Sequence, residues 1–183
     1  MGKLDPESQN ALICGLMIYE ENNVIRDIFD FSGAVMLLSK ALETELRKYF
    51  MNDYIQYLKQ KAVKEEDFPE AVKDTINNHF VIGSVEYILG YECKPEWQLN
   101  TDKRKADKDV LYEYLKTRFA VGTNAAVNER IRNIYNTVSK IRLVYRNPAT
   151  HEESVDYEEC EGFIDYLLFK DRSFQRMMEL FVK

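Results

Sequence analysis

The sequence is poor in glycine and proline, the two residues that most often interrupt regular structure, with seven and four among 183 residues. An all-β fold of many short strands needs more turn residues than this, and an apolar content of 45% is too high for a disordered chain. The three cysteines, Cys14, Cys93 and Cys160, are far apart and form no CxxC pair. The cysteine pattern therefore excludes a disulfide framework and a cysteine-based zinc site.

Long apolar runs are also missing, and the first ten residues are polar. We therefore expect a cytoplasmic protein that does not associate with membranes. A chain of 183 residues can bury a core of its own, and no linker, repeat or low-complexity tract marks a second part. The sequence predicts a single helical domain over residues 1–183.

Apolar residues recur at spacings of three and four in several segments, which predicts an all-α fold of long and additional short helices. The first helix should begin at Asp5-Pro6-Glu7, where a capping side chain precedes a proline. Pro148 should end the long helix at Arg146, because proline disfavours helix in the residue before it. The expected helices cover residues 6–19, 27–61, 69–78, 84–90, 105–119, 124–146, 156–169 and 173–182.

Two faces are predicted for the helix over residues 124–146. The face expected to be buried carries Ile131, Ile134, Val138, Ile141 and Tyr145. A second face is polar and basic, and it carries Asn128, Arg132, Tyr135, Ser139, Arg142 and Arg146. The chain as a whole has a net charge of −6, but residues 123–151 carry five cations against one anion, Glu129. Such a strip can bind one anionic ligand, although a solvated helix face is the commoner explanation.

The segment Arg146-Asn147-Pro148-Ala149-Thr150-His151 carries the clearest chemical groups. An arginine can hold a phosphate through two parallel hydrogen bonds, and a histidine can move a proton near neutral pH. Asn147 adds a neutral donor that could orient either of them. The alternative is structural: Arg146 caps a helix, Asn147 turns the chain and His151 forms a hydrogen bond near the next helix start.

This segment resembles the Arg-polar-xxx-His motif of the HEPN superfamily, the higher eukaryote and prokaryote nucleotide-binding domains. Two upstream stretches are similar to certain bacterial members: residues 39–47, Ser-Lys-Ala-Leu-Glu-Thr-Glu-Leu-Arg, and residues 80–83, Phe-Val-Ile-Gly. The resemblance covers most of the chain in order, but only the Arg146 to His151 motif is specific.

The resemblance implies a HEPN-like helical bundle that forms a homodimer and acts as a metal-independent endoribonuclease without a cofactor. His151 would transfer the proton, Arg146 would clamp the phosphate and Asn147 would position them, leaving 2',3'-cyclic phosphate ends. Arg132 and Arg142 are the expected RNA-binding residues of the basic face. The implied biological role is a toxin or an antiviral defence effector, with RNA as substrate and a cognate antitoxin or regulatory protein as partner.

Two alternatives stay open: a non-catalytic module that dimerises or binds a partner or a nucleotide, and an antitoxin or regulatory subunit. Glu43 lies upstream on a charged helix and is interpreted as a solvated side chain, although an acid near the site matters in some HEPN families. The acids between Glu152 and Glu161 are interpreted as complements of a helix dipole rather than as a metal site.

Overall fold

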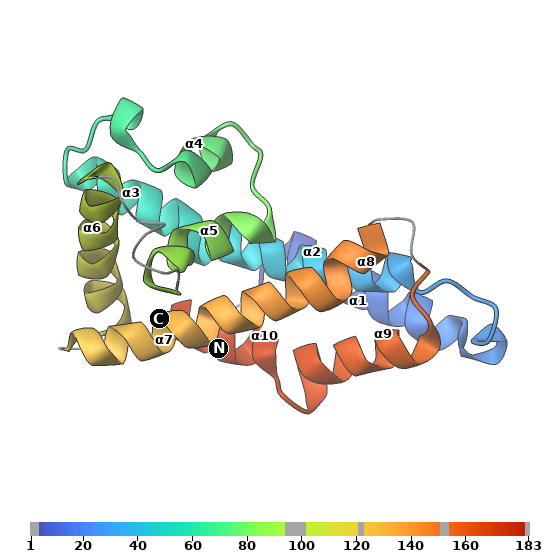
Figure 1. The fold of residues 1–183 in the computed structure, drawn as a ribbon. Helices are drawn as coiled ribbons and strands as arrows, with labels where there is room; N and C mark the ends of the chain where they lie inside the picture. Colours follow the sequence, from blue (N-terminus) through green and yellow to red (C-terminus); the bar gives the residue numbers. More distant parts are fainter. Residues whose placement is uncertain (1–3, 94–101, 121–122, 151–153, 182–183) are drawn as a thin grey trace. The chain divides into compact units, whose positions relative to one another are not determined.

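The computed structural model describes residues 4–93, 102–120, 123–150 and 154–181, and all regular structure within these ranges is helical (Figure 1). The all-α prediction is therefore confirmed. The chain forms two compact units: unit one contains residues 1–45 and 140–183, and unit two contains residues 46–139. The single-domain organisation stays a prediction. No helix within the described ranges is long and apolar enough to cross a membrane.

Unit one is formed by the two ends of the chain, drawn in blue and in orange to red in Figure 1. Its helical segments are α1 (Pro6–Glu21), the 3-10 turn η1 (Asn23–Ile25), α2 (Ser32–Leu46), the π turn η5 (Ile141–Arg146), α8 (Asn147–Thr150), α9 (Tyr157–Ile164), the π turn η6 (Asp165–Phe169) and α10 (Ser173–Phe181).

Helices α1 and α2 approach each other closely at Gly15. A Cβ atom at this position would lie 2.9 Å from Leu38 Cγ and 3.2 Å from the carbonyl oxygen of Ala34. At the start of α1, the Asp5 side chain caps the helix as predicted, and the Asp5 N–H donates a 2.7 Å hydrogen bond to Glu45 Oε1. The small residue and this hydrogen bond fix the packing of α1 on α2.

Helix α2 begins at Ser32, so the predicted start near residue 27 was wrong. The reason is the Asp30 carboxylate, whose Oδ1 accepts hydrogen bonds from the Ser32 N–H at 2.9 Å and the Ser32 hydroxyl at 2.7 Å. This local turn competes with helix through residue 30. The same oxygen accepts the Val155 N–H at 3.0 Å, which ties the start of α2 to the segment before α9.

The predicted helix end at Arg146 was also wrong, because η5 continues into α8. The backbone at Asn147 is helical, and its N–H donates to the Arg142 carbonyl five residues earlier. This wider turn shifts the hydrogen-bond ladder by one residue. Pro148 therefore lies inside a continuous helical run, and because it has no N–H it cannot donate a hydrogen bond to a carbonyl of the preceding turn.

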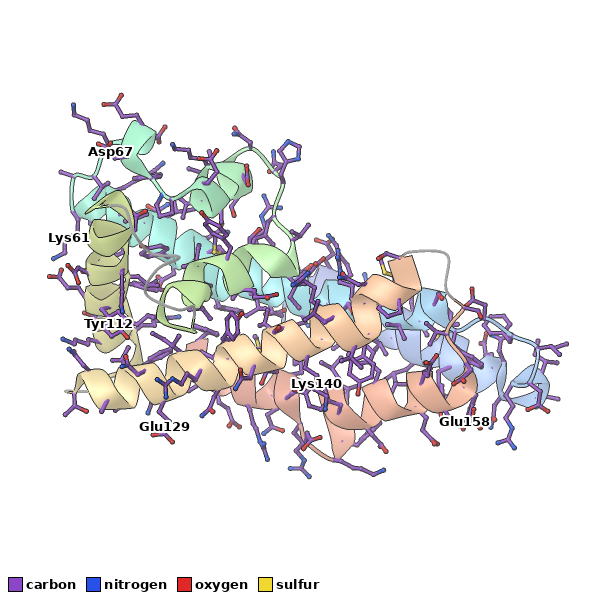
Figure 2. The ribbon with its side chains drawn as sticks, viewed as in Figure 1. Lys61, Asp67, Tyr112, Glu129, Lys140 and Glu158 are labelled. Atoms are coloured by element: carbon purple, nitrogen blue, oxygen red, sulfur yellow. The ribbon has the colours of Figure 1, made fainter. Side chains whose placement is uncertain are left out.

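Unit two contains the π turn η2 (Arg47–Met51), α3 (Asn52–Gln60), the 3-10 turn η3 (Glu65–Asp67), α4 (Glu70–Ile76), α5 (Ile82–Cys93), α6 (Asp102–Phe119) and most of α7 (Asn124–Lys140). The rings of Phe50, Tyr54 and Tyr114 pack together in its core. Lys61, labelled in Figure 2, pairs with Glu113 of α6 at 3.1 Å. The predicted buried face of α7 is confirmed, since Ile131, Ile134 and Val138 are all at most 1% exposed.

Candidate functional site

Arg146 is the last residue of the π turn η5, and its guanidinium is held by a carboxylate from α2. The Nη2 atom lies 3.1 Å from Glu43 Oε1, and the side chains of Arg146 and Glu43 are only 19% and 9% exposed. The attraction within such a largely buried pair is stronger than in a surface pair, but removing the two charges from water costs free energy that can equal this gain. The pair therefore fixes where the guanidinium lies in unit one.

The interpretation of Glu43 as a solvated side chain was wrong. The residue is 7% exposed and lies against Arg146, far away in the sequence. A signal for its burial exists in the helical spacing, because Ser39, Glu43, Leu46 and Phe50 lie at successive intervals of four, three and four. Leu46 and Phe50 are fully buried, and Ser39 and Glu43 lie on the same face of the helix. Their spacing therefore predicts that Ser39 and Glu43 are buried as well.

Asn147 follows Arg146 directly and is half-buried. Its carbonyl oxygen accepts a 2.8 Å hydrogen bond from the Thr150 hydroxyl, which closes the single turn of α8. The structure thus places Arg146 and Asn147 at the junction of η5 and α8. His151, the third residue of the predicted motif, lies outside the described residues.

The predicted basic face is divided between the two units. Arg142 is half-buried on η5 in unit one, together with Arg146, whereas Arg132 is exposed on α7 in unit two. In unit two the same face is partly used for helix packing. The Tyr112 hydroxyl of α6 donates a hydrogen bond to Asn128, and the Ser139 hydroxyl donates one to Glu86 of α5 at 3.4 Å.

Apolar side chains lie beside Arg146 on the same π turn. Leu143 is 53% exposed and Val144 is 55% exposed. On the other side of η5, Tyr145 is half-buried, and its ring stacks on Phe163 of α9 at 4.6 Å. The π turn therefore exposes Leu143 and Val144 to solvent. Ile141 and Tyr145 pack inward, as predicted for the buried face of this helix.

Asp156, Glu158 and Glu159 lie at the start of α9, as predicted, whereas Glu152 and Glu153 lie outside the described residues. Asp156 Oδ1 accepts the Glu159 N–H at 2.8 Å, and Glu159 Oε2 accepts the Asp156 N–H at 3.2 Å, which together form a capping box. Within the part of the chain that the structure describes, no group of three or more His, Cys, Asp or Glu residues could hold a metal ion.

Comparison of the chain with protein-family models, with curated proteins and with solved structures found no match. The assignment of the motif therefore depends on the residues themselves and on the geometry around Arg146.

Proposed function

We propose that this chain is a metal-independent endoribonuclease of the HEPN type that uses Arg146, Asn147 and His151. The observation that supports the proposal most is the ion pair between Arg146 and Glu43, 3.1 Å long and largely buried. It holds an arginine in a defined place directly before Asn147, at the end of a helical turn. A phosphate clamp needs this kind of preorganised cation, because a side chain that is already fixed loses little entropy on binding.

The proposed reaction is an internal transesterification at one phosphodiester of RNA. The 2'-oxygen forms a bond to phosphorus, the bond from phosphorus to the 5'-oxygen breaks, and the products carry a 2',3'-cyclic phosphate and a 5'-hydroxyl. His151 accepts the proton of the 2'-hydroxyl, and the 5'-oxygen gains a proton as it leaves. Arg146 stabilises the negative charge that develops on the phosphoryl oxygens, and Asn147 orients the phosphate.

The proposal includes a homodimer, because one arginine and one histidine form a sparse site. Two copies of the motif facing each other would supply a second histidine for the leaving 5'-oxygen. Arg142, which lies on the same π turn as Arg146, would extend the positive charge toward the flanking phosphates. Arg132 of unit two is the further RNA-binding residue that we propose. The biological role would be that of a toxin or antiviral effector, controlled by an antitoxin or regulatory protein.

The test is cleavage of mixed cellular RNA by the purified protein in excess EDTA, beside the variants His151→Ala and His79→Ala. The chain has two histidines, so His79→Ala controls for the loss of an imidazole elsewhere. We expect wild-type protein and His79→Ala to cut RNA, and His151→Ala to leave it intact. Equal cleavage by His151→Ala would remove the proposed mechanism.

A second candidate function is favoured by one specific observation, the exposure of Leu143 and Val144 beside Arg146. Exposed aliphatic residues next to a cation are suited to a protein interface, so the segment could serve a non-catalytic module that dimerises or binds a partner protein. In that case Leu143→Ser changes the oligomeric state or the partner affinity, and RNA is not cut by any variant. The RNA-cleavage assay separates this function from the nuclease, and sedimentation analysis of wild type and Leu143→Ser tests whether the segment forms an interface.

A further inference from the structure

Phe169, the last residue of the π turn η6, presents its ring to solvent, and 59% of the residue is exposed. All ten phenylalanines of the chain lie in the described residues, and each of the others is buried or half-buried. One exposed apolar residue is common on a protein surface and needs no partner by itself. Phe169 differs because of the charges that follow it in the chain.

Residues 170–176 carry three cations and a single acid. The cations, Lys170, Arg172 and Arg176, are all exposed. Lys170 pairs with Asp165, whereas Arg172 and Arg176 form no ion pair within the described residues. A guanidinium binds phosphate through two parallel hydrogen bonds, and an aromatic ring can stack on the face of any nucleobase. An exposed ring beside unpaired arginines is therefore typical of a surface that binds single-stranded nucleic acid.

Hydrogen bonds hold the turn between η6 and α10 at both of its ends. The Lys170 N–H donates a 2.8 Å hydrogen bond to the Asp165 carbonyl. The Ser173 hydroxyl donates a 2.9 Å hydrogen bond to the Tyr166 carbonyl, which ties the start of α10 to η6. The backbone of Phe169 is therefore fixed before a ligand binds, and an aromatic side chain on a fixed backbone loses little entropy on binding.

Within unit one, η6 lies next to η5. The ring of Tyr166 in η6 stacks on the ring of Tyr145 in η5, with the two centroids 6.0 Å apart. Lys140, labelled in Figure 2, places its Nζ atom 3.9 Å from the centre of the Tyr166 ring. Arg146 follows Tyr145 directly in the chain. An RNA strand that binds Arg146 can therefore continue from η5 onto η6 without leaving unit one.

We propose that Phe169 stacks on an unpaired base of the RNA strand that binds Arg146, and that Arg172 and Arg176 bind phosphates of the same strand. The ligand is single-stranded RNA, because a base inside a duplex does not offer its face to a side chain. This inference rests on the proposed function, since it takes RNA at Arg146 as the ligand. It adds a binding subsite outside the motif, which positions the strand and takes no part in the chemical step.

The test uses a single-stranded RNA in which every 2'-hydroxyl is replaced by fluorine, because this ligand keeps its phosphodiesters but cannot cyclise. Its affinity is measured by fluorescence anisotropy for wild type, Phe169→Leu, Phe169→Trp and Tyr87→Leu. Leucine keeps an apolar side chain but removes the aromatic face, whereas tryptophan keeps both. Tyr87→Leu is the matched control, because Tyr87 is a 37% exposed aromatic residue of α5 in unit two. The melting midpoint of each free protein is measured as well.

We expect Phe169→Leu to bind the fluorinated strand about tenfold more weakly than wild type, which is within the usual range for the loss of one stacked base. Phe169→Trp should bind at least as tightly as wild type, and Tyr87→Leu should bind like wild type. A fluorinated duplex of the same sequence should bind wild type and Phe169→Leu equally. The melting midpoints should agree, because the Phe169 ring is exposed and contributes little to the core.

Two further comparisons test the contacts with the base and with the phosphates. Removing the bases of the strand one at a time should weaken wild-type binding about tenfold at one position, and the same removal should not weaken Phe169→Leu further. Arg172→Gln and Arg176→Gln should each reduce the slope of log affinity against log salt concentration by about 0.7. Lys64→Gln, which removes an exposed cation of unit two, should leave that slope unchanged.

Equal affinity of Phe169→Leu and wild type for the single strand would overturn the inference, as would an equal loss of affinity for the duplex. If wild type cuts ordinary RNA while Phe169→Leu binds like wild type, the inference fails and the proposed function stands. If wild type binds the strand through Phe169 but leaves ordinary RNA intact, the stacking site stands and the proposed nuclease fails. If wild type neither binds nor cuts RNA, both fail.

Discussion

Replacing Glu43 by glutamine should lower the free energy of unfolding by about 2–3 kcal/mol, because it leaves the guanidinium of Arg146 buried without its counter-charge. Removing one partner of a fully buried ion pair costs about 3–5 kcal/mol. The lower figure applies here because the Arg146 side chain is still 19% exposed and the amide of glutamine can keep one hydrogen bond. For a chain of this size the change corresponds to a fall in the melting temperature of about 4–12 °C.

The assay is a double-mutant cycle in urea with Glu43→Gln, Arg146→Gln and the double variant. We expect a coupling energy of about 1.5–3 kcal/mol, since each single change removes the counter-charge of the other group and the double change removes both charges. The matched control is the exposed pair of Lys64 and Glu66, whose side chains are 77% and 74% exposed. A double-mutant cycle at Lys64 and Glu66 should give a coupling energy below about 0.5 kcal/mol.

The result that would refute the reasoning is additivity at Glu43 and Arg146. If the losses of unfolding free energy in the two single variants sum to the loss in the double variant within about 0.5 kcal/mol, the two groups do not interact in solution. Arg146 would then not be held in place by Glu43, and the preorganised cation on which the proposed function depends would be absent.

Three further predictions follow from other parts of the structure. In thermal melts, Gly15→Ala should destabilise the fold by about 1–2 kcal/mol, because the new methyl group overpacks the contact of α1 with α2. Gly162→Ala in α9 should stabilise the fold by about 0.5–1 kcal/mol, because its Cβ would meet nothing within 4 Å. Hydrogen bonds from the Ser32 side chain and backbone lower the pKa of Asp30 below 3.8. The ionised Asp30 side chain therefore contributes its full stabilisation of the fold above pH 3.8. The difference in urea midpoint between wild type and Asp30→Ala should therefore shrink as the pH falls below 3.8, and a constant difference would contradict the assignment. Burial raises the pKa of Cys160 to about 12, so peptide mapping after iodoacetamide treatment at about pH 8 should find the exposed Cys14 alkylated and Cys160 unmodified.

Much of the helical structure could be predicted from residue spacing, because helix burial is a local pattern. Ile131, Ile134, Val138 and Ile141 recur at helical intervals, and all four are buried. The prediction was wrong where two local preferences compete. The side chain of Asp30 delays the start of α2 to Ser32, and a wide turn carries the helix past Pro148.

The candidate site was only partly accessible from the sequence. Arg146 and Asn147 could be selected from their chemistry and spacing, but the partner of Arg146 could not. Glu43 precedes it by most of the chain, and pairing the two requires knowledge of which helix faces meet.

The most direct test of the central claim is the chemistry of the product ends after cleavage of a single, defined RNA in EDTA. The account predicts 2',3'-cyclic phosphate and 5'-hydroxyl ends from the wild-type protein, and neither from Arg146→Ala or His151→Ala. Products with 3'-hydroxyl and 5'-phosphate ends would show that water, not the 2'-hydroxyl, attacks phosphorus, and they would contradict the account.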